Sequence, residues 1–520
     1  MLQATPTPEV PVALPLRQRM VPQLPADALV SWLLTAAVTA LAAFTRFTSL
    51  SVPNALVFDE TYYVKDGLSI VRFGYERGAN GNADAELLAG NTDIFSDSAS
   101  FVIHPPLGKA LIGAGQLLFG ADPFGWRFAA ALVGTLTVLI TIRAIRRLTR
   151  STAIGVFAGL LLTLDGLHLT LSRTALLDGF LTFFVIAAFA LLLLDRDQSR
   201  QRLADWAERR PGPLAAVGEA GPRLGARWWR IGAGVALGLA CGVKWSAVFF
   251  VLAFGLMTVL WDAGARKACG VRRPLVAMLK RDALPAFGGI VGIGAVAYLL
   301  TWTGWLASDG GWSRQWAAGR DSAFAFIPES IRSLWHFHSE ILASARQITS
   351  EHPYSSDPIG WPFLARPVSM FYDGDQASCG ADSCSQAVTA LGNPAIWWAG
   401  IAAIAIGLFW WIGRRDWRAG ALLGGVAAGW LPWFLVGDRT IFSWYIVAAA
   451  PFLCGLIAMV LGWVLGPANA PGNRRVWGAA AVGAYLLLVA VLFAWFWPVW
   501  TAQVIPYEDW LRRMWVRSWI

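Results

Sequence analysis

Two adjacent carboxylates, Asp59 and Glu60, directly follow the first long apolar segment of the chain. At that position they are expected close to a bilayer surface, where partial desolvation raises the proton affinity of a carboxylate, as a general base requires. Neighbouring helical residues point about 100° apart, so the two acids would perform different tasks. The competing interpretation is a solvated acidic pair that caps an interfacial helix, and the local sequence by itself favours that interpretation.

Four cations are predicted to converge on the same membrane face as these acids. Each stands at the end of an expected membrane span: Arg127, Arg173, Lys244 and Arg439. Charges at such places are costly and usually functional, and a cationic cluster above hydrocarbon suits the phosphate of a lipid-linked substrate. The alternative is that they are snorkelling anchors or form intramembrane ion pairs, such as Arg173 with Asp178.

The histidines of the outer segments are weaker candidates. His104 and Lys109 flank a Pro-Pro turn, where they would bind phosphate or orient a carboxylate, although a lone histidine in such a turn is more often structural. His352 stands in a later outer segment. A metal site made of His336, His338 and His352 is disfavoured, because the first two lie on opposite faces of a strand and far apart on a helix.

Two Asp-x-Asp sequences, at 195–197 and 373–375, match the cation-holding motif of nucleotide-sugar enzymes. The first is expected on the cytoplasmic side, and neither lies in a nucleotide-binding fold, so both are discounted. We therefore expect no obligatory metal and no cofactor.

The composition requires that these residues be positioned by membrane helices. Of the 520 residues, 56% are hydrophobic and only 14% are charged. A soluble protein carries roughly 25% charged residues, so this chain is neither an ordinary cytosolic enzyme nor disordered. The net charge of +9 resembles that of a nucleic-acid-binding protein. In a polytopic membrane protein, however, excess arginine belongs to cytoplasmic loops, and no nucleic-acid partner is expected.

Apolar runs predict an all-α protein with about eleven transmembrane helices. The run 231–262 is too long for one span and is interrupted at Cys241–Trp245, so we divide it into two helices that meet near Lys244; a single tilted helix is the alternative. The other expected spans are 28–50, 125–143, 152–170, 175–194, 285–306, 395–413, 419–436, 441–465 and 477–497.

Loop charges predict the orientation. Short loops rich in arginine, such as 143–150 and 263–283, belong in the cytoplasm, whereas the long acidic loops face outward. The amino terminus is then cytoplasmic and the carboxyl terminus extracytoplasmic. The expected regions are a cytoplasmic tail 1–27, a catalytic membrane module 28–306 with outer loop 51–124, a large outer loop 307–394, a four-helix membrane module 395–497 and an outer tail 498–520.

Two of the five cysteines, Cys379 and Cys384, lie together in the large outer loop. Outside the membrane a small disulfide between them is expected. The other three cysteines fall in spans or in a basic loop and are expected to be reduced.

Six motifs in a fixed order resemble those of the protein O-mannosyltransferases, over about residues 30–520. They are Phe58-Asp59-Glu60, His104-Pro105-Pro106-Leu107-Gly108-Lys109, Ser172-Arg173-Thr174-Ala175-Leu176-Leu177-Asp178, Val243-Lys244-Trp245-Ser246, His352-Pro353-Tyr354-Ser355-Ser356 and the terminal Met514-Trp515-Val516-Arg517-Ser518-Trp519-Ile520. The outer loop 306–394 is too short for the sugar-binding-like β-trefoil of the eukaryotic members, so the chain resembles a bacterial member.

This resemblance implies a C-type glycosyltransferase (GT-C) fold in the bacterial plasma membrane, with two large outer loops. It implies transfer of mannose from polyprenyl-phosphate mannose to Ser or Thr hydroxyls of unfolded or translocating secreted proteins, near the Sec translocon, with inversion. Asp59 would be the catalytic carboxylate, Glu60 would lie near the acceptor, and Arg127 would match an arginine important for activity. The alternatives are a related transferase that moves another lipid-linked sugar to a lipid or glycan, and, more remotely, a transporter.

Overall fold

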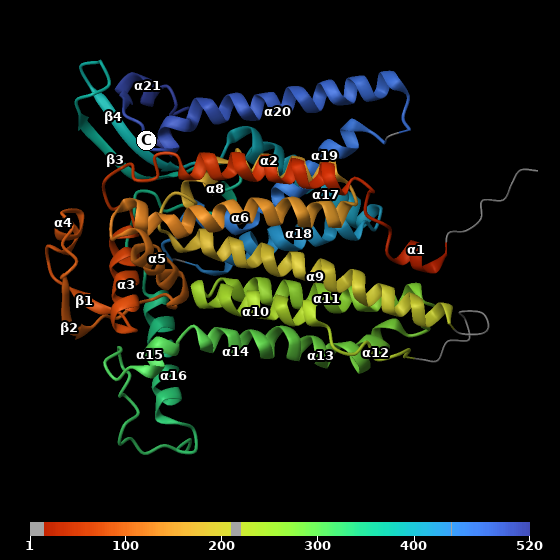
Figure 1. Ribbon diagram of the computed structural model, residues 1–520, viewed down its shortest axis with the longest axis horizontal. Coiled ribbons are helices and arrows are strands. Elements are labelled where there is room, and N and C mark those ends of the chain that lie inside the picture. Colours follow the sequence, from red (N-terminus) through yellow and green to blue (C-terminus); the bar gives the residue numbers. More distant parts are fainter. Residues whose placement is uncertain (1–14, 210–219, 438, 468) are drawn as a thin grey trace, which may run out of the picture.

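The computed structural model describes residues 15–209, 220–437, 439–467 and 469–520. Long helices lie roughly parallel in a bundle, and most of the remaining elements gather at one end of it (Figure 1). The described part of the chain has eight segments long and apolar enough to cross a membrane. They are α2 (Ala28–Phe47), α6 (Pro123–Thr149), α9 (Leu177–Glu208), α11 (Ala247–Ala268), the segment Pro274–Leu300, α17 (Pro394–Gly413), the segment Ser443–Leu465 that ends in α19 (Ala450–Leu465), and α20 (Gly472–Trp500).

Segment Pro274–Leu300 is a succession of helical types. It comprises α12 (Pro274–Met278), a π-helical turn (Leu279–Ala283), α13 (Leu284–Phe287), a second π-helical turn (Gly288–Gly292) and α14 (Ile293–Leu300). A 3₁₀ segment, Ser443–Ala449, precedes α19.

Three further apolar stretches are covered by shorter helices. They are α7 (Thr152–Thr163) with α8 (Gly166–Leu171), α10 (Trp228–Val243), and α18 (Trp417–Trp430) with the 3₁₀ turn Leu431–Leu435. The division of run 231–262 is confirmed, because α10 ends at Val243, Lys244 is extended and α11 begins at Ala247. A single tilted helix is therefore wrong, while the count of eleven crossings stays a prediction.

The outer region between α2 and α6 contains helices that hydropathy did not predict. They are α3 (Glu60–Phe73), α4 (Ala83–Leu88) and α5 (Leu107–Phe119). Helices α3 and α5 cross at two glycines: a Cβ on Gly67 would lie 2.6 Å from the carbonyl oxygen of Lys109, and one on Gly113 would lie 2.2 Å from the carbonyl oxygen of Gly67. This close approach fixes the helix that begins with the acidic pair.

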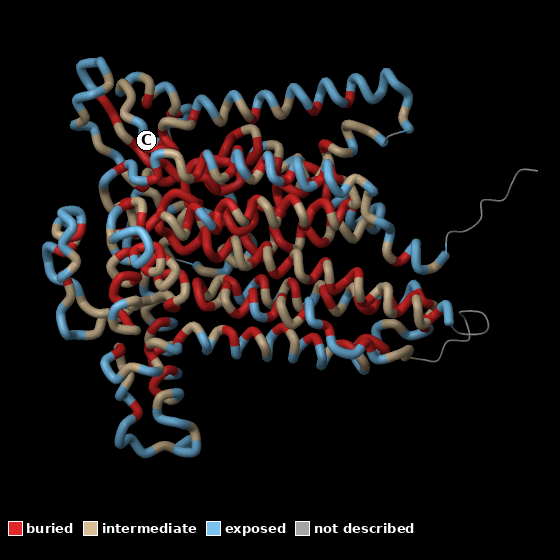
Figure 2. The backbone as a smooth tube through the Cα atoms, viewed as in Figure 1, coloured by how far each residue is buried: buried red, intermediate tan, exposed pale blue. Residues whose placement is uncertain are grey.

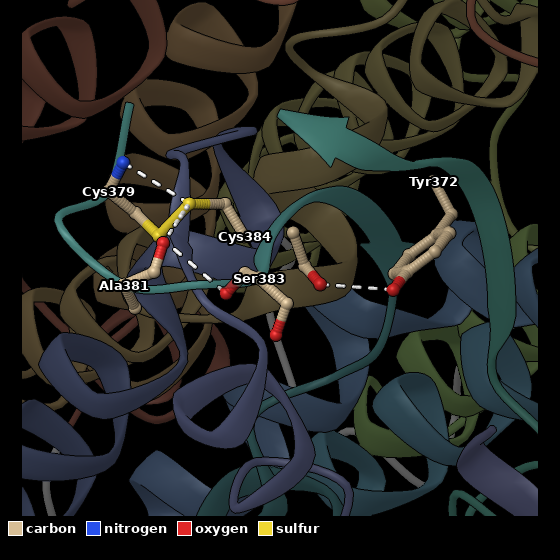
Figure 3. Close-up of a disulfide and its surroundings, with 6 residues drawn as sticks. Tyr372, Cys379, Ala381, Ser383 and Cys384 are labelled. Carbon is tan, nitrogen blue, oxygen red and sulfur yellow. Dashed lines mark hydrogen bonds between the residues drawn. A yellow bond between two sulfur atoms is a disulfide. The ribbon is translucent and has the colours of Figure 1, made fainter. Parts of the chain in front are cut away.

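Two small antiparallel sheets modify the expected all-α fold. Strand β1 (Arg77–Ala79) pairs with β2 (Phe95–Ala99), and β3 (Val368–Gln376) pairs with β4 (Cys384–Ala390), which also pairs with β5 (Ile505–Pro506). The registers align Arg77 with Ala99, Val368 with Ala390 and Cys384 with Pro506. The predicted disulfide Cys379–Cys384 is confirmed at the tip of the β3–β4 hairpin (Figure 3).

The remaining helical elements are α1 (Leu16–Met20), α15 (Thr303–Ala307), α16 (Glu329–Arg346), α21 (Tyr507–Leu511) and the 3₁₀ turns Pro358–Gly360 and Arg517–Trp519. Helix α1 and the carboxyl terminus lie at opposite ends of the bundle (Figure 1).

Burial divides the helices into a central and a peripheral set (Figure 2). In its most apolar window, Ser443–Leu465 is 83% buried and α9 is 67% buried, whereas α20 is only 17% buried. Peripheral helices expose large apolar side chains such as Leu252, Leu284 and Leu487. An apolar surface of this extent requires lipid rather than water around it.

Candidate functional site

Glu60 is a fully buried anchor, although the sequence predicted that it would lie near the acceptor. The main-chain N–H groups of Val57 and Ala175 each donate to its carboxylate at 2.8 Å. Arg127 donates to it twice, from Nε at 2.9 Å and from Nη2 at 2.8 Å. Because its side chain is 0% exposed and has four donors, Glu60 ties the start of α3 to α6 and to the loop before α9. This geometry contradicts direct contact with an acceptor.

Arg127 uses all five of its N–H donors within the protein. Besides the two bonds to Glu60, its Nη1 donates to the carbonyl oxygens of Leu50 (3.2 Å) and Pro53 (2.9 Å), and its Nη2 donates to that of Ala55 (2.7 Å). An arginine has no further donor to offer. In this structure Arg127 therefore has no donor left for the predicted phosphate contact, and its bonds hold the turn between α2 and α3.

Arg173 has a similar structural task at the end of α2. Its guanidinium donates to four carbonyl oxygens of that helix end, at 2.7–3.1 Å; they belong to Thr45, Arg46, Thr48 and Ser49. The last carbonyl groups of a helix lack partners within it, so an arginine placed there satisfies them. Arg173 thus binds the end of α2 and is not the partner of Asp178, while its predicted phosphate contact stays a prediction.

Asp178 pairs instead with Lys244. The ammonium nitrogen of Lys244 lies 2.9 and 3.0 Å from the two carboxylate oxygens and 4.0 Å from the ring centre of Tyr445. Lys244 occupies the break between α10 and α11, and Asp178 lies in the first turn of α9. This pair places one positive and one negative charge beside Asp59, and both act on its carboxylate.

Asp59 differs from its neighbour because the residue is only partly buried and its carboxylate has one weak partner among the described residues, the Tyr63 hydroxyl, which donates at 3.3 Å. Desolvation raises the pKa of Asp59 to about 6, with Lys244 lowering it and Asp178 raising it further. A carboxylate with this pKa is mostly ionised at neutral pH yet a stronger base than an ordinary aspartate, which suits proton abstraction.

The backbone that presents Asp59 is strained and held by aromatic packing. Phe58 has a φ of 51°, which a bulky residue rarely adopts. Its ring centre lies 5.1 Å from that of Trp444, 6.0 Å from that of Phe442 and 6.1 Å from that of His352. Strained residues persist where the surroundings over-determine them, and they concentrate at functional sites. His352 therefore reaches the site through packing against Phe58.

Arg439 is the predicted cation whose side chain remains available. It lines two grooves of about 400 and 640 Å³, together with Ser355. Its buried Nε atom has no hydrogen-bond partner among the described residues. Its charge acts on the buried ring of His104 and, with Lys244 and Lys109, helps burial to lower the pKa of that histidine well below its usual value. Arg439 is thus the remaining candidate for an anionic ligand.

Lys109 belongs to a separate buried cluster. Its ammonium group bonds Glu76 and lies 3.5 Å from Asp66. Burial, the largest cause, raises the pKa of Asp66 to about 6 against the opposing charge of Lys109. Lys109 therefore joins α5 to α3 and to the segment that follows it. His104 packs near Tyr63, with ring centres 6.1 Å apart.

The two Asp-x-Asp sequences have other partners. Asp195 bonds Arg227, and Asp197 accepts from Arg147 and Arg150 at 2.7 Å. Asp373 accepts hydrogen bonds from the main-chain N–H of Asp375 and from the side-chain amide of Gln376.

Sequence reasoning missed two groups at the site. Tyr63 follows Asp59 by four residues, the spacing of neighbours on one helical face, so its contact was open to prediction. Tyr445 lies against Lys244 from a distant segment, and no local signal points to it.

The family model described as dolichyl-phosphate-mannose-protein mannosyltransferase matches residues 36–267, and that of the C-terminal four-helix membrane region of protein-O-mannosyltransferase matches residues 330–519. The polyprenol-phosphate-mannose–protein mannosyltransferase of Mycobacterium tuberculosis is 40% identical over 508 residues, which cover 95% of this chain and 93% of the relative. The protein of the same name from Corynebacterium glutamicum is 35% identical, with 93% and 92% covered.

The Saccharomyces cerevisiae protein O-mannosyltransferase Pmt1–Pmt2 complex, solved with its sugar donor bound, has a similar fold. Its TM-score is 0.72 at 15% identity, over 97% of this chain and 94% of the matched chain. This likeness shows the fold.

Proposed function

Because the chain belongs to the protein O-mannosyltransferase family, we propose that it transfers mannose from a polyprenyl-phosphate mannose to Ser or Thr hydroxyls of proteins, with inversion at C1. The observation that carries the residue assignment is the contrast between the two adjacent acids. Glu60 is fully buried and has four donors, whereas Asp59 is a partly exposed residue whose carboxylate has one weak partner among the described residues and a pKa raised to about 6.

In this proposal Asp59 accepts the proton of the Ser or Thr hydroxyl. The hydroxyl oxygen then attacks C1 of mannose, the bond between C1 and the phosphate oxygen breaks, and the electron pair leaves with polyprenyl phosphate. Such a general base typically accelerates the reaction by 10²–10⁴-fold. The phosphate needs no proton to leave, because a cation can match its charge, and Arg439 is the available one.

Glu60 and Arg127 act as positioning residues. Their bidentate pair fixes the first turn of α3, so that Asp59 meets the substrate in one orientation. Lys244 and Asp178 set the local field at Asp59. His104 and His352 pack around the site without an assigned step.

We further propose that the arginine-rich end of the bundle, where α1 lies, is cytoplasmic and that the site faces outward in a bacterial plasma membrane. The disulfide near the carboxyl terminus supports this orientation, because such bonds persist in oxidising compartments. Since Asp59 is partly buried, an extended segment reaches it more readily than a folded surface does. This favours unfolded acceptors, and we propose that they emerge near the Sec translocon.

The test is turnover by membranes given labelled polyprenyl-phosphate mannose and a Ser/Thr peptide. Asp59→Asn keeps the shape of the side chain but removes the base, so we expect turnover to fall by at least about 100-fold with donor binding retained. Near-normal turnover of Asp59→Asn would remove Asp59 from the reaction. Activity of the wild type should persist in a chelator such as EDTA, since the proposed step uses protein cations only; its loss would show that a metal is required.

A further inference from the structure

A second charged cavity lies at the opposite end of the bundle, where α1 is located (Figure 1). It has a volume of about 400 Å³ and is formed by α1, α9, α11, the end of α6 and the start of α18. Five arginines and one aspartate line it: Arg19, Arg150, Arg196, Arg200, Arg418 and Asp416. None of these residues takes part in the proposed reaction at Asp59.

The positive charge of this cavity exceeds what nearby acids neutralise. Asp416 is bound to Arg418 at 2.7 Å, and Asp197, just outside the lining, is bound to Arg150 at 2.7 Å. Arg200 donates to the carbonyl oxygen of Met20 at 2.8 Å, which neutralises no charge. The lining therefore keeps three more positive charges than these two aspartates balance.

Arg196 shows that the site is built into the fold. Its guanidinium lies 3.3 Å from the ring centre of Trp417, and the residue is 7% exposed. The nearest carboxylate, that of Asp197, is 3.8 Å away, and the buried Nε of Arg196 has no hydrogen-bond partner among the described residues. Buried donors are nearly always satisfied in proteins. The bias of arginine toward cytoplasmic loops explains solvated side chains but not this one.

We propose that this cavity binds the phosphate group of an anionic phospholipid from the membrane leaflet at this end of the bundle. Arginine matches phosphate oxygens with paired donors, and clustered cations at a membrane boundary attract anionic headgroups. The walls favour a lipid over a soluble phosphate, because Leu260 and Trp261 line the cavity and the exposed Leu252 and Leu256 continue along α11 toward the lipid. An acyl chain on α11 would thus be continuous with a headgroup at Arg196.

The experiment is native mass spectrometry of the purified full chain titrated with phosphatidylglycerol or phosphatidylcholine. We expect the wild type to retain one phosphatidylglycerol in preference to phosphatidylcholine. The double variant Arg196→Gln/Arg200→Gln should weaken this binding by roughly 10- to 30-fold. The double variant Arg272→Gln/Arg273→Gln removes the same charge from the same end of the molecule but outside the cavity. Its affinity for phosphatidylglycerol should stay within about twofold of that of the wild type.

A milder pair of variants guards against misfolding of the double variant. Arg19 and Arg17 are both exposed on α1, but only Arg19 lines the cavity. Arg19→Gln should weaken phosphatidylglycerol binding by roughly fivefold, and Arg17→Gln should not.

Pyrophosphate distinguishes the source of the phosphate. If it competes with phosphatidylglycerol, the phosphate site is supported; if it binds at the cavity while phosphatidylglycerol shows no preference, the ligand is soluble and the lipid assignment is overturned. The site itself would be overturned if the wild type retained both lipids equally and did not bind pyrophosphate. It would also be overturned if Arg19→Gln and Arg196→Gln/Arg200→Gln kept the wild-type preference for phosphatidylglycerol.

Discussion

The buried pair Glu60–Arg127 allows the sharpest test, because sequence and structure assign it different tasks. Arg127→Met removes two of the four donors to the Glu60 carboxylate and leaves the carbonyl groups of Leu50, Pro53 and Ala55 without this partner. Breaking one side of a buried ion pair costs about 3–5 kcal/mol. We therefore expect a loss of unfolding free energy of at least about 4 kcal/mol.

Glu60→Gln leaves the Arg127 charge buried and should cost about 3 kcal/mol. The double variant should lose about 2–3 kcal/mol less than the sum of the single variants, because it carries neither unpaired charge. Arg72→Met is the matched control: Arg72 is exposed on α3 and donates only to the carbonyl group of Thr92, so its effect should stay within about 0.5 kcal/mol.

The assay is denaturant unfolding of detergent-solubilised protein, followed by tryptophan fluorescence, together with donor affinity of the fraction that remains folded. If Arg127 only positions the α2–α3 turn, folded Arg127→Met keeps near-normal donor affinity. A variant with wild-type stability and donor affinity lowered tenfold or more would restore the phosphate-binding task and refute this reasoning.

Four further outcomes are expected. Arg439→Gln should weaken donor affinity by roughly 10- to 100-fold without loss of stability, since its guanidinium carries no structural bond among the described residues; an unchanged KM for the donor would contradict this. Turnover should fall as pH drops through about 6, the raised pKa of Asp59, because the base is then protonated; a pH profile flat between 5 and 7 would oppose the assignment. The same raised pKa makes ionisation of Asp59 destabilising: the stability due to its protonated form is complete below about pH 4 and is lost as pH rises through about 6. Asp59→Asn should therefore be more stable than wild type at pH 7.5, by up to about 3 kcal/mol, but not at pH 4. Replacing Cys379 and Cys384 by serine should cost at most about 2 kcal/mol and leave turnover within twofold, because the disulfide closes a short hairpin away from the acidic pair; a large loss of turnover would place that hairpin in acceptor binding.

The sequence by itself determined the features that depend on local composition. Apolar runs of about 20 residues form helices in lipid whatever their neighbours are, because every backbone polar group must be bonded within the segment. The same reasoning located the break at Lys244, and the acidic outer loop with two close cysteines predicted the disulfide. The order of the motifs indicated the family.

Only the tertiary structure decided which charged residues are free. Arg127, Arg173 and Arg439 look alike in sequence, since each stands at the end of an apolar segment. Folding brings Glu60 and three carbonyl groups to Arg127 and a helix end to Arg173, and within the described part of the chain it leaves the Nε of Arg439 without a partner. A guanidinium binds whichever oxygens lie within about 3 Å, and these come from segments far away in the chain, so the spacing of residues along the sequence carries no information about them.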